Sequence, residues 1–346
     1  MSAAASPPPS SLAELEDRLS EPTQSVIDMM HRLLGDILVL GVAGKMGPSL
    51  IRMAKRASDE AGTQRNIIGV SRFRDAAARN ELERHGIETI TCDLLDERAL
   101  TALPEAPNII YMAGMKFGAT SQEPLTWAMN TLLPSLICQR YRTSRIAAFS
   151  TGNIYGLVPT SGSGSRESDT PNPAGEYAQS CLGRERIFEY YAQAYGTPVS
   201  LIRLNYACDL RYGVLVDIAQ KVWRGEPVDV TMGHFNTIWQ GDANALSLLF
   251  LEHAATPAWK INLTGSITLK VREVAERFGL AFGKTVQITG TEAPDALLSD
   301  SSLCSNTIGS ATVSEDELID WVAAWVSQGG ATLGKPTHFE SRDGKF

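Results

Sequence analysis

The chain has 346 residues, 43% of them hydrophobic and 20% charged, which is an ordinary globular composition and enough for one large or two modest domains. Its formal net charge is −8 without any basic run, which argues against a nucleic-acid partner. The five cysteines are scattered without a Cys-x-x-Cys pair and no apolar run reaches membrane-spanning length, so we expect a cytoplasmic protein with no disulfide, metal site or membrane partner.

Residues 1–35 are predicted to form a tail followed by a helical extension. Residues 1–11 are rich in Ala, Ser and Pro, and they lack the positive charge and apolar core of a signal peptide. From Leu12 to Leu34 apolar residues recur at helical spacing, with a break at Pro22. We therefore expect a short helical segment that packs on the main domain.

Strand-like and helix-like patterns alternate over the next 170 residues. The run 36–40 suits a strand buried on both faces, and similar runs recur at 66–70, 87–92, 108–112, 145–150 and 199–204. Helical patterns lie between them, at 49–61, 75–85, 124–141 and 177–195. This alternation predicts an α/β fold, a Rossmann-type doubly wound parallel sheet over residues 36–205, with a return segment at about 236–264. Residues 206–235 and 265–346 are expected to form a smaller substrate-binding part and a C-terminal tail.

A glycine-rich turn follows the first predicted strand and opens the first helix. Gly41, Gly44 and Gly47 would let the backbone approach a pyrophosphate, and the helix N-terminus would supply N–H groups and a positive dipole end. Its position between a strand and a helix favours a dinucleotide site over the alternative of a plain strand–helix turn.

The end of the second predicted strand indicates which dinucleotide is bound. NAD sites usually place an acid there for the ribose hydroxyls, whereas this chain has Ser71 followed by Arg72, which could pair with a 2′-phosphate. We therefore expect NADP, with NAD as second choice; the alternative is that Arg72 and Arg74 are solvated loop charges. Asp93, after the third strand, suits an adenine contact or an exposed surface position equally well.

Three further motifs carry a family resemblance. They are Tyr-Met-Ala-Gly-Met-Lys at 111–116, Phe-Ser-Thr-Gly-Asn-Ile-Tyr-Gly at 149–156, and the proline-containing approach to Tyr177 at 171–177. Together with the glycine turn they resemble the extended short-chain dehydrogenase/reductase family, also called the NAD-dependent epimerase/dehydratase family, and its UDP-galactose 4-epimerase-type members, over residues 36–326.

The resemblance implies an oxidoreductase or epimerase that moves a hydride between a nicotinamide and the carbinol carbon of a sugar, a sugar acid or a nucleotide-sugar. Tyr177 would be the acid/base, Thr151 would orient the same oxygen, and Lys116 would contact the cofactor. It also implies a homodimer formed through the helices at 124–141 and 177–195, and the alternative is that the aromatic residues of the second helix belong to the buried core. The residues expected at the cofactor are Gly41, Gly44, Lys45, Met46, Gly47, Ser71, Arg72, Asp93, Leu94, Met112, Ala113, Gly114, Asn130 and Cys181.

The region after the sixth predicted strand is expected to bind the small-molecule substrate. Arg211 could offer a charged fork to a phosphate or carboxylate, or it could be a surface arginine in a turn. His234 could contact the ligand or be structural. The substrate candidates are Asn205, Tyr206, Arg211, Tyr212, His234, Asn236, Trp239 and Gln240.

One position departs from the family pattern, because Cys181 stands four residues after Tyr177 where the family has a lysine. Positions i and i+4 share a helix face, so the missing cation would have lain beside the catalytic hydroxyl and lowered its pKa. Lys116 or Arg184 could supply the charge instead. Three interpretations stay open: an active enzyme, a diverged site with other chemistry, and a non-catalytic dinucleotide-binding sensor or scaffold.

Overall fold

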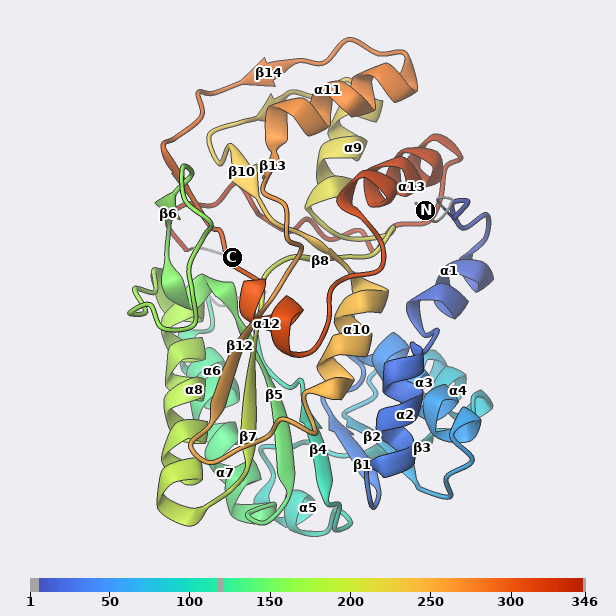
Figure 1. Cartoon of the computed structure of the whole chain (residues 1–346), viewed down its shortest axis with the longest axis vertical. Coiled ribbons are helices and arrows are strands. Elements are labelled where there is room, and N and C mark those ends of the chain that lie inside the picture. Colours follow the sequence, from blue (N-terminus) through green and yellow to red (C-terminus); the bar gives the residue numbers. More distant parts are fainter. Residues whose placement is uncertain (1–5, 117–120, 345–346) are drawn as a thin grey trace.

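A seven-stranded parallel sheet forms the centre of the protein, in a computed structural model that describes residues 6–116 and 121–344 (Figure 1). The strand order is β12-β7-β5-β4-β1-β2-β3, and each neighbouring pair is parallel, which confirms the predicted Rossmann-type sheet. Residues 1–5 of the expected tail, 117–120, and the C-terminal residues 345–346 lie outside the described part. The strands are β1 (Ile37–Leu40), β2 (Ile67–Ser71), β3 (Glu88–Thr91), β4 (Asn108–Tyr111), β5 (Arg145–Thr151), β7 (Val199–Leu204) and β12 (Trp259–Leu263).

Strand β1 shows why the sequence pattern identified the sheet. All four of its residues are buried, because successive side chains point to opposite faces and helices cover both. Ile37 and Val39 pack in one core with α2 (Gln24–Arg32), α3 (Gly47–Glu60) and α10 (Gln240–Leu249). Leu38 and Leu40 pack in the opposite core with α7 (Leu133–Arg140) and α8 (Gly175–Tyr195).

The N-terminal segment contains two capped helices, α1 (Leu12–Leu19) and α2. Ser11 and Thr23 accept the backbone N–H groups of Glu14 and Val26, which satisfies donors that a helix start leaves unpaired. Helix α2 packs against α3 and α10 beside the sheet, and α1 lies across α10 and α3. The remaining helices of this part are α4 (Ala76–Arg84), α5 (Glu97–Thr101) and α6 (Glu123–Trp127), followed by a π-helical turn, η1 (Ala128–Leu132), and, after β5, by a 3-10 turn, η2 (Gly152–Tyr155).

A second core lies above the carboxyl edge of the sheet in the view of Figure 1. It is built around α9 (Val214–Arg224), α11 (Val271–Phe282) and α13 (Glu315–Ser327), which pack on one another. Four short strand pairs lie outside the central sheet: β6 (Val158–Pro159) with β15 (Asp295–Ala296), β8 (Ala207–Cys208) with β11 (Ile238–Trp239), β9 (Val228–Asp229) with β14 (Ile288–Thr289), and β10 (His234–Phe235) with β13 (Leu269–Lys270). Helix α12 (Ser302–Thr307) packs beside β12.

In the part of the chain that the structure describes, no helix combines the length and the apolar character needed to cross a membrane. The same part holds no cluster of three or more His, Cys, Asp or Glu side chains suited to a metal ion.

Candidate active site

A cavity of about 820 Å³ opens at the carboxyl edge of the sheet, between the sheet and the second core. Its walls come from the turns after β1 and β4, the ends of β5 and β7, the first turn of α8, and the segment 205–213. Ligands of open α/β sheets bind at this edge, where the chain leaves each strand. The cavity therefore brings together segments that the sequence analysis had singled out separately.

The glycine turn forms the floor of the cavity. Gly41 has φ +89°, and a Cβ there would lie 2.7 Å from the backbone nitrogen of Ala113. A Cβ on Gly47 would lie 2.0 Å from the Val42 carbonyl oxygen. Both positions require glycine, and the result is a tight turn that opens helix α3 toward the cavity. This arrangement fits a dinucleotide pyrophosphate.

The loop after β4 presents Gly114 and Lys116 to the cavity, and Asn130 fixes its shape. The Asn130 amide accepts the backbone N–H of Met115 at 2.9 Å and donates to the Met115 carbonyl at 2.9 Å. Asn130 lies in η1, where the widened helical turn directs it inward, and it is fully buried. Asn130 does not line the cavity itself, so it shapes the cavity only through this loop.

Tyr177 and Thr151 meet on one wall of the cavity. Tyr177 lies in the first turn of α8, and its side chain hydrogen-bonds with those of Thr151 and Cys181. Thr151 ends β5, and its hydroxyl also bonds Asn153. Burial, and then Cys181, raise the pKa of the Tyr177 phenol, while Arg184 and Thr151 act in the opposite direction. The phenol is therefore protonated at neutral pH in the unliganded protein.

Cys181, which stands where the family has a lysine, is buried and does not line the cavity. Its side chain therefore contributes no group to the cavity wall. The nearest buried cation is Arg184, one turn further along α8. Its guanidinium donates to the Phe149 carbonyl at 2.8 Å and to Asn130 Oδ1 at 2.5 Å. A Cβ on Gly114 would lie 2.4 Å from Arg184 Nη2, so the glycine is what allows the guanidinium to lie directly behind the cavity wall.

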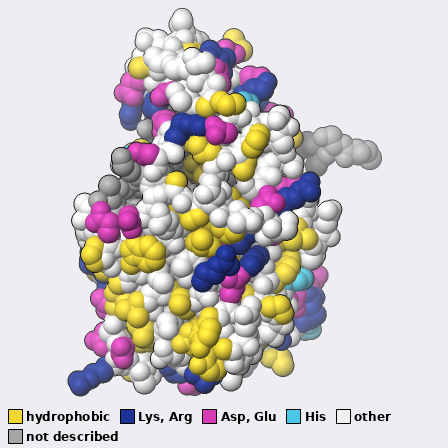
Figure 2. Space-filling view, turned by 90° about the vertical axis from the view of Figure 1, so that its left-hand side faces the viewer, with side chains coloured by type: hydrophobic (Ala, Val, Ile, Leu, Met, Phe, Trp, Pro, Cys, Tyr) yellow, Lys and Arg dark blue, Asp and Glu magenta, His cyan; other side chains and the backbone are white. Residues whose placement is uncertain are grey.

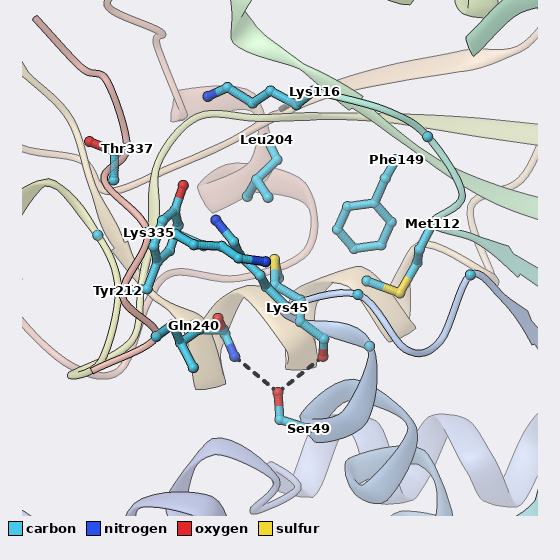
Figure 3. A pocket seen from close by; sticks show the side chains of 18 of the residues that line it. Lys45, Ser49, Met112, Lys116, Phe149, Leu204, Tyr212, Gln240, Lys335 and Thr337 are labelled. Atoms are coloured by element: carbon cyan, nitrogen blue, oxygen red, sulfur yellow. Dashed lines mark hydrogen bonds between the residues drawn. The ribbon is translucent and has the colours of Figure 1, made fainter. Parts of the chain in front are cut away.

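Lys116 supplies a second cation, with its ammonium group 5.7 Å from the centroid of the Tyr177 ring. Burial lowers the pKa of Lys116 to about 8, and Cys181 partly opposes that change. Lys45 reaches from the glycine turn across the cavity to Tyr212, 3.2 Å from the ring centroid (Figure 3). Burial, and then repulsion by Lys116 and Lys335, lower the pKa of Lys45 to about 7.

The substrate candidates divide into two groups. Asn205, Tyr206, Arg211, Tyr212 and Gln240 line the cavity. Within that group the Arg211 guanidinium is already engaged by both Asp209 oxygens and by Glu16. Gln240 is held by Ser49, the α3 residue to which it donates at 3.0 Å (Figure 3).

The other substrate candidates lie away from the cavity. Trp239 is only 3% exposed and its ring packs edge-on against Trp321, 5.4 Å between centroids. His234 lies in β10, paired with Lys270 of β13. Asn236 is buried, and its amide accepts the Ser299 backbone N–H and donates to the Thr268 hydroxyl. The structure therefore places all three outside the cavity wall.

Five of the expected cofactor contacts also lie outside the cavity wall, namely Ser71, Arg72, Asp93, Leu94 and Ala113. Arg72 and Asp93 are exposed beside it, and Leu94 is buried. Asp75, which the sequence analysis did not single out, does line the cavity, and its carboxylate caps α4 by accepting the Ala77 N–H at 2.9 Å.

Both ends of the chain contribute residues that sequence reasoning missed. Glu16 of α1 lines the cavity, and so do Leu333, Lys335 and Thr337 of the segment after α13. These residues belong to no motif and follow Gly- and Pro-containing stretches, so only the tertiary fold brings them to the site. Gly44, Met46 and Met112, three more of the residues expected at the cofactor, line the cavity.

Residues 37–208 match the model of the NAD dependent epimerase/dehydratase family, which confirms the family resemblance seen in the sequence. The fold is similar to dTDP-glucose 4,6-dehydratase from Bacillus anthracis in complex with NAD, with TM-score 0.72, 15% identity, and coverage of 85% of this chain and 97% of that one. It is also similar to UDP-glucose 4-epimerase with UDP-glucose from Thermotoga maritima (TM-score 0.69, 18% identity, 86% and 99%). A third similar structure is UDP-glucuronic acid 4-epimerase from Bacillus cereus with UDP-glucuronic acid and NAD (TM-score 0.68, 16% identity, 85% and 99%). No curated protein sequence matches the chain.

Proposed function

We propose that the protein is an NAD(P)-dependent enzyme that oxidises, reduces or epimerises a secondary alcohol of a sugar, a sugar acid or a nucleotide-sugar. The observation that carries the proposal is the contact between the Tyr177 and Thr151 hydroxyls on the wall of a cavity whose floor is the glycine turn. The family match over residues 37–208 supports it. The similar structures include a dehydratase and epimerases crystallised with NAD or a nucleotide-sugar. All five cysteines are free thiols, which supports a cytoplasmic location.

The residues of the cavity divide the work of binding and proton transfer. Gly41, Gly44, Lys45 and Gly47 would hold the pyrophosphate of a dinucleotide, whose nicotinamide would supply the hydride chemistry when bound. Thr151 would orient the reacting oxygen. Tyr177, protonated at neutral pH, would donate its proton to the alkoxide formed on reduction and take it back on oxidation. Lys116 and the buried Arg184 would make the tyrosinate less costly by their positive charge.

The choice between the two dinucleotides depends on two residues at the end of β2, Ser71 and Arg72. We propose NADP, because Ser71 offers no carboxylate and Arg72 is exposed there, where its charge could pair with the 2′-phosphate of a bound dinucleotide. NAD is the second candidate, and Asp75 favours it because a carboxylate on the cavity wall would accept ribose hydroxyls. Titration of NADPH and NADH fluorescence tests this choice: Arg72→Ala should weaken NADPH binding at least tenfold more than NADH binding. Equal effects would leave NAD as the cofactor.

Turnover of sugars, sugar acids and nucleotide-sugars tests the reaction itself. With a substrate found in that panel, Tyr177→Phe should lower kcat by about 10²–10⁴-fold with NADPH affinity within twofold of wild type. Thr151→Val should lower kcat while leaving cofactor binding intact. Tight dinucleotide binding without turnover in any member of the panel would favour the second candidate, a non-catalytic sensor or scaffold, which the buried Cys181 in place of a lysine supports.

We also propose that the protein is a homodimer formed through the outer face of α6, η1 and α8. This face carries exposed large hydrophobic side chains, as the view of this side of the molecule illustrates (Figure 2). Exposed aromatic and aliphatic residues that gather on neighbouring helices are typical of an interface rather than of a free surface. The residues are Leu125, Trp127, Leu132, Tyr190 and Tyr195.

A further inference from the structure

The segment after α13 crosses the mouth of the cavity and is anchored on both sides of Lys335. Before it, the Leu333 backbone N–H donates to the Arg211 carbonyl at 3.1 Å. After it, Thr337 donates its backbone N–H and its hydroxyl to Asp217 Oδ2, at 2.8 and 2.6 Å. Phe339 is then buried against Phe235, 6.4 Å between ring centroids. Lys335 is thus carried by an ordered strap whose position is fixed by α9 and the second core.

Lys335 and Lys45 extend toward the same part of the cavity from opposite walls (Figure 3). Lys45 comes from the glycine turn and rests on the face of Tyr212. The acidic groups around them are occupied elsewhere, because Asp217 accepts the two Thr337 bonds and Glu16 pairs with Arg211 and Arg52. An otherwise acidic protein therefore gathers positive charge at one point of its cavity.

We propose that Lys335, together with Lys45, forms an oxyanion-binding site that makes the C-terminal strap a part of the ligand-binding machinery. The chemistry it would recognise is a phosphate, diphosphate or carboxylate group with at least one negative charge. Burial, and then repulsion by Lys116 and Lys335, lower the pKa of Lys45 to about 7, and an anion between the Lys45 and Lys335 ammonium groups would offset the part that Lys335 contributes. Tyr212 holds the Lys45 side chain extended into the cavity, so little side-chain entropy is lost on binding.

Two sources could supply the oxyanion, and this assignment rests on the proposed function. One is the pyrophosphate of the dinucleotide, because Lys45 belongs to the turn expected to hold it. The other is an anionic group of the substrate, because the strap lies on the same side of the cavity as Tyr212, one of the expected substrate contacts (Figure 3). Lys45 and Lys335 could bind the oxyanion of either ligand. Binding experiments with each ligand separately distinguish the two sources.

The test compares Lys335→Gln, which removes the charge, with Lys335→Arg, which keeps it. NADPH affinity is measured by fluorescence, and affinity for UDP is measured by calorimetry on protein saturated with NADPH. If the cofactor supplies the oxyanion, Lys335→Gln weakens NADPH binding about three- to tenfold and leaves UDP unchanged. If the substrate supplies it, the same loss falls on UDP alone. In either case Lys335→Arg stays within twofold of wild type.

Inorganic pyrophosphate added to the unliganded protein is the third probe, because it reports on the lysine site without any dinucleotide. Its binding should be weakened by Lys335→Gln and unaffected by Lys270→Gln, an exposed lysine of β13 that pairs with Glu273. Pyrophosphate binding that depends on Lys335, in a protein that binds no dinucleotide, would keep this site and defeat the proposed function. Affinities for all three probes within twofold of wild type in Lys335→Gln, or an equal loss in Lys335→Arg, would overturn the proposal.

Discussion

Arg184 is the residue that most changes the interpretation of the missing lysine. The sequence suggested that it could lie on the same face of α8 as Tyr177, and the structure shows how it does so, with its guanidinium behind Gly114. It does not line the cavity, so it can hold no ribose hydroxyl. Its remaining role would be electrostatic, as a positioning residue that lowers the pKa of Tyr177 against the effect of burial.

The pH dependence of turnover tests that role. Burial raises the pKa of Tyr177 above its ordinary value, so the tyrosinate needed for oxidation is scarce at neutral pH and grows tenfold per pH unit. Oxidation should therefore speed up as pH rises from 6 to 9, while reduction, which uses the phenol, should stay flat apart from the loss of charge on Lys116, whose pKa is about 8. The measurement is kcat/KM against pH in both directions. A flat oxidation profile would remove Tyr177 as the base.

Substitution of Arg184 separates its charge from its hydrogen bonds. Arg184→Met should raise the pKa of Tyr177 further and lower the oxidation rate at pH 7 by about tenfold for each pK unit. Arg184→Lys keeps the cation but loses part of the contact with Phe149 and Asn130. We therefore expect a lower free energy of unfolding and an unchanged pH dependence of the oxidation rate. Equal displacement of the profile in both variants would show that Arg184 acts only through packing.

At the scale of elements, the π-helical turn η1 is what connects the helix face to the active-site loop. It directs Asn130 inward, where the amide bonds the Met115 backbone, Ser180 at 3.0 Å and Arg184. One side chain thus joins the loop after β4 to helix α8. A helix of uniform pitch would rotate that side chain away, which is why π turns are frequent at functional sites.

Removal of this amide should cost both stability and activity. Asn130→Ala removes the buried partner of the Met115 backbone groups and one of the two buried partners of the Arg184 guanidinium, so we expect the free energy of unfolding to fall by about 2–4 kcal/mol. Urea denaturation monitored by tryptophan fluorescence measures it, and KM for the cofactor should rise as the Lys116 loop loosens. The control is Gln139→Ala, at an exposed position of α7, which we expect to stay within about 0.5 kcal/mol of wild type. Similar losses in both variants would argue against the role assigned to η1.

The elements also show what sequence patterns can and cannot reveal. The parallel sheet followed from buried runs such as 37–40, and the glycine turn, Thr151 and Tyr177 followed from their places at strand and helix ends. Trp239 and His234 were expected near the ligand because they flank a turn, but whether a turn residue faces the cavity or the second core depends on packing. The pitch of η1 has no recognisable signature in the sequence around Asn130.

At the scale of the whole molecule, both termini return to the same cavity. Helix α1 brings Glu16, which pairs with Arg211 and Arg52, and the strap brings Lys335. Contacts between residues this far apart in the chain leave no local pattern, so the sequence predicted a tail without indicating where it docks. A ligand that contacts both terminal segments in the cavity would stabilise the native state by mass action.

The proposed dimer gives the last prediction. The wild-type protein should have a mass near twice 37.5 kDa by sedimentation velocity at micromolar concentration. Leu132, 54% exposed on η1, lies among the hydrophobic side chains of the proposed interface, so Leu132→Asp would bury a charge there and should weaken association at least tenfold. The matched control is Leu280, which is 85% exposed on the outer side of α11, and Leu280→Asp should leave the dimer intact. A monomeric wild type, or equal dissociation of both variants, would contradict this interface.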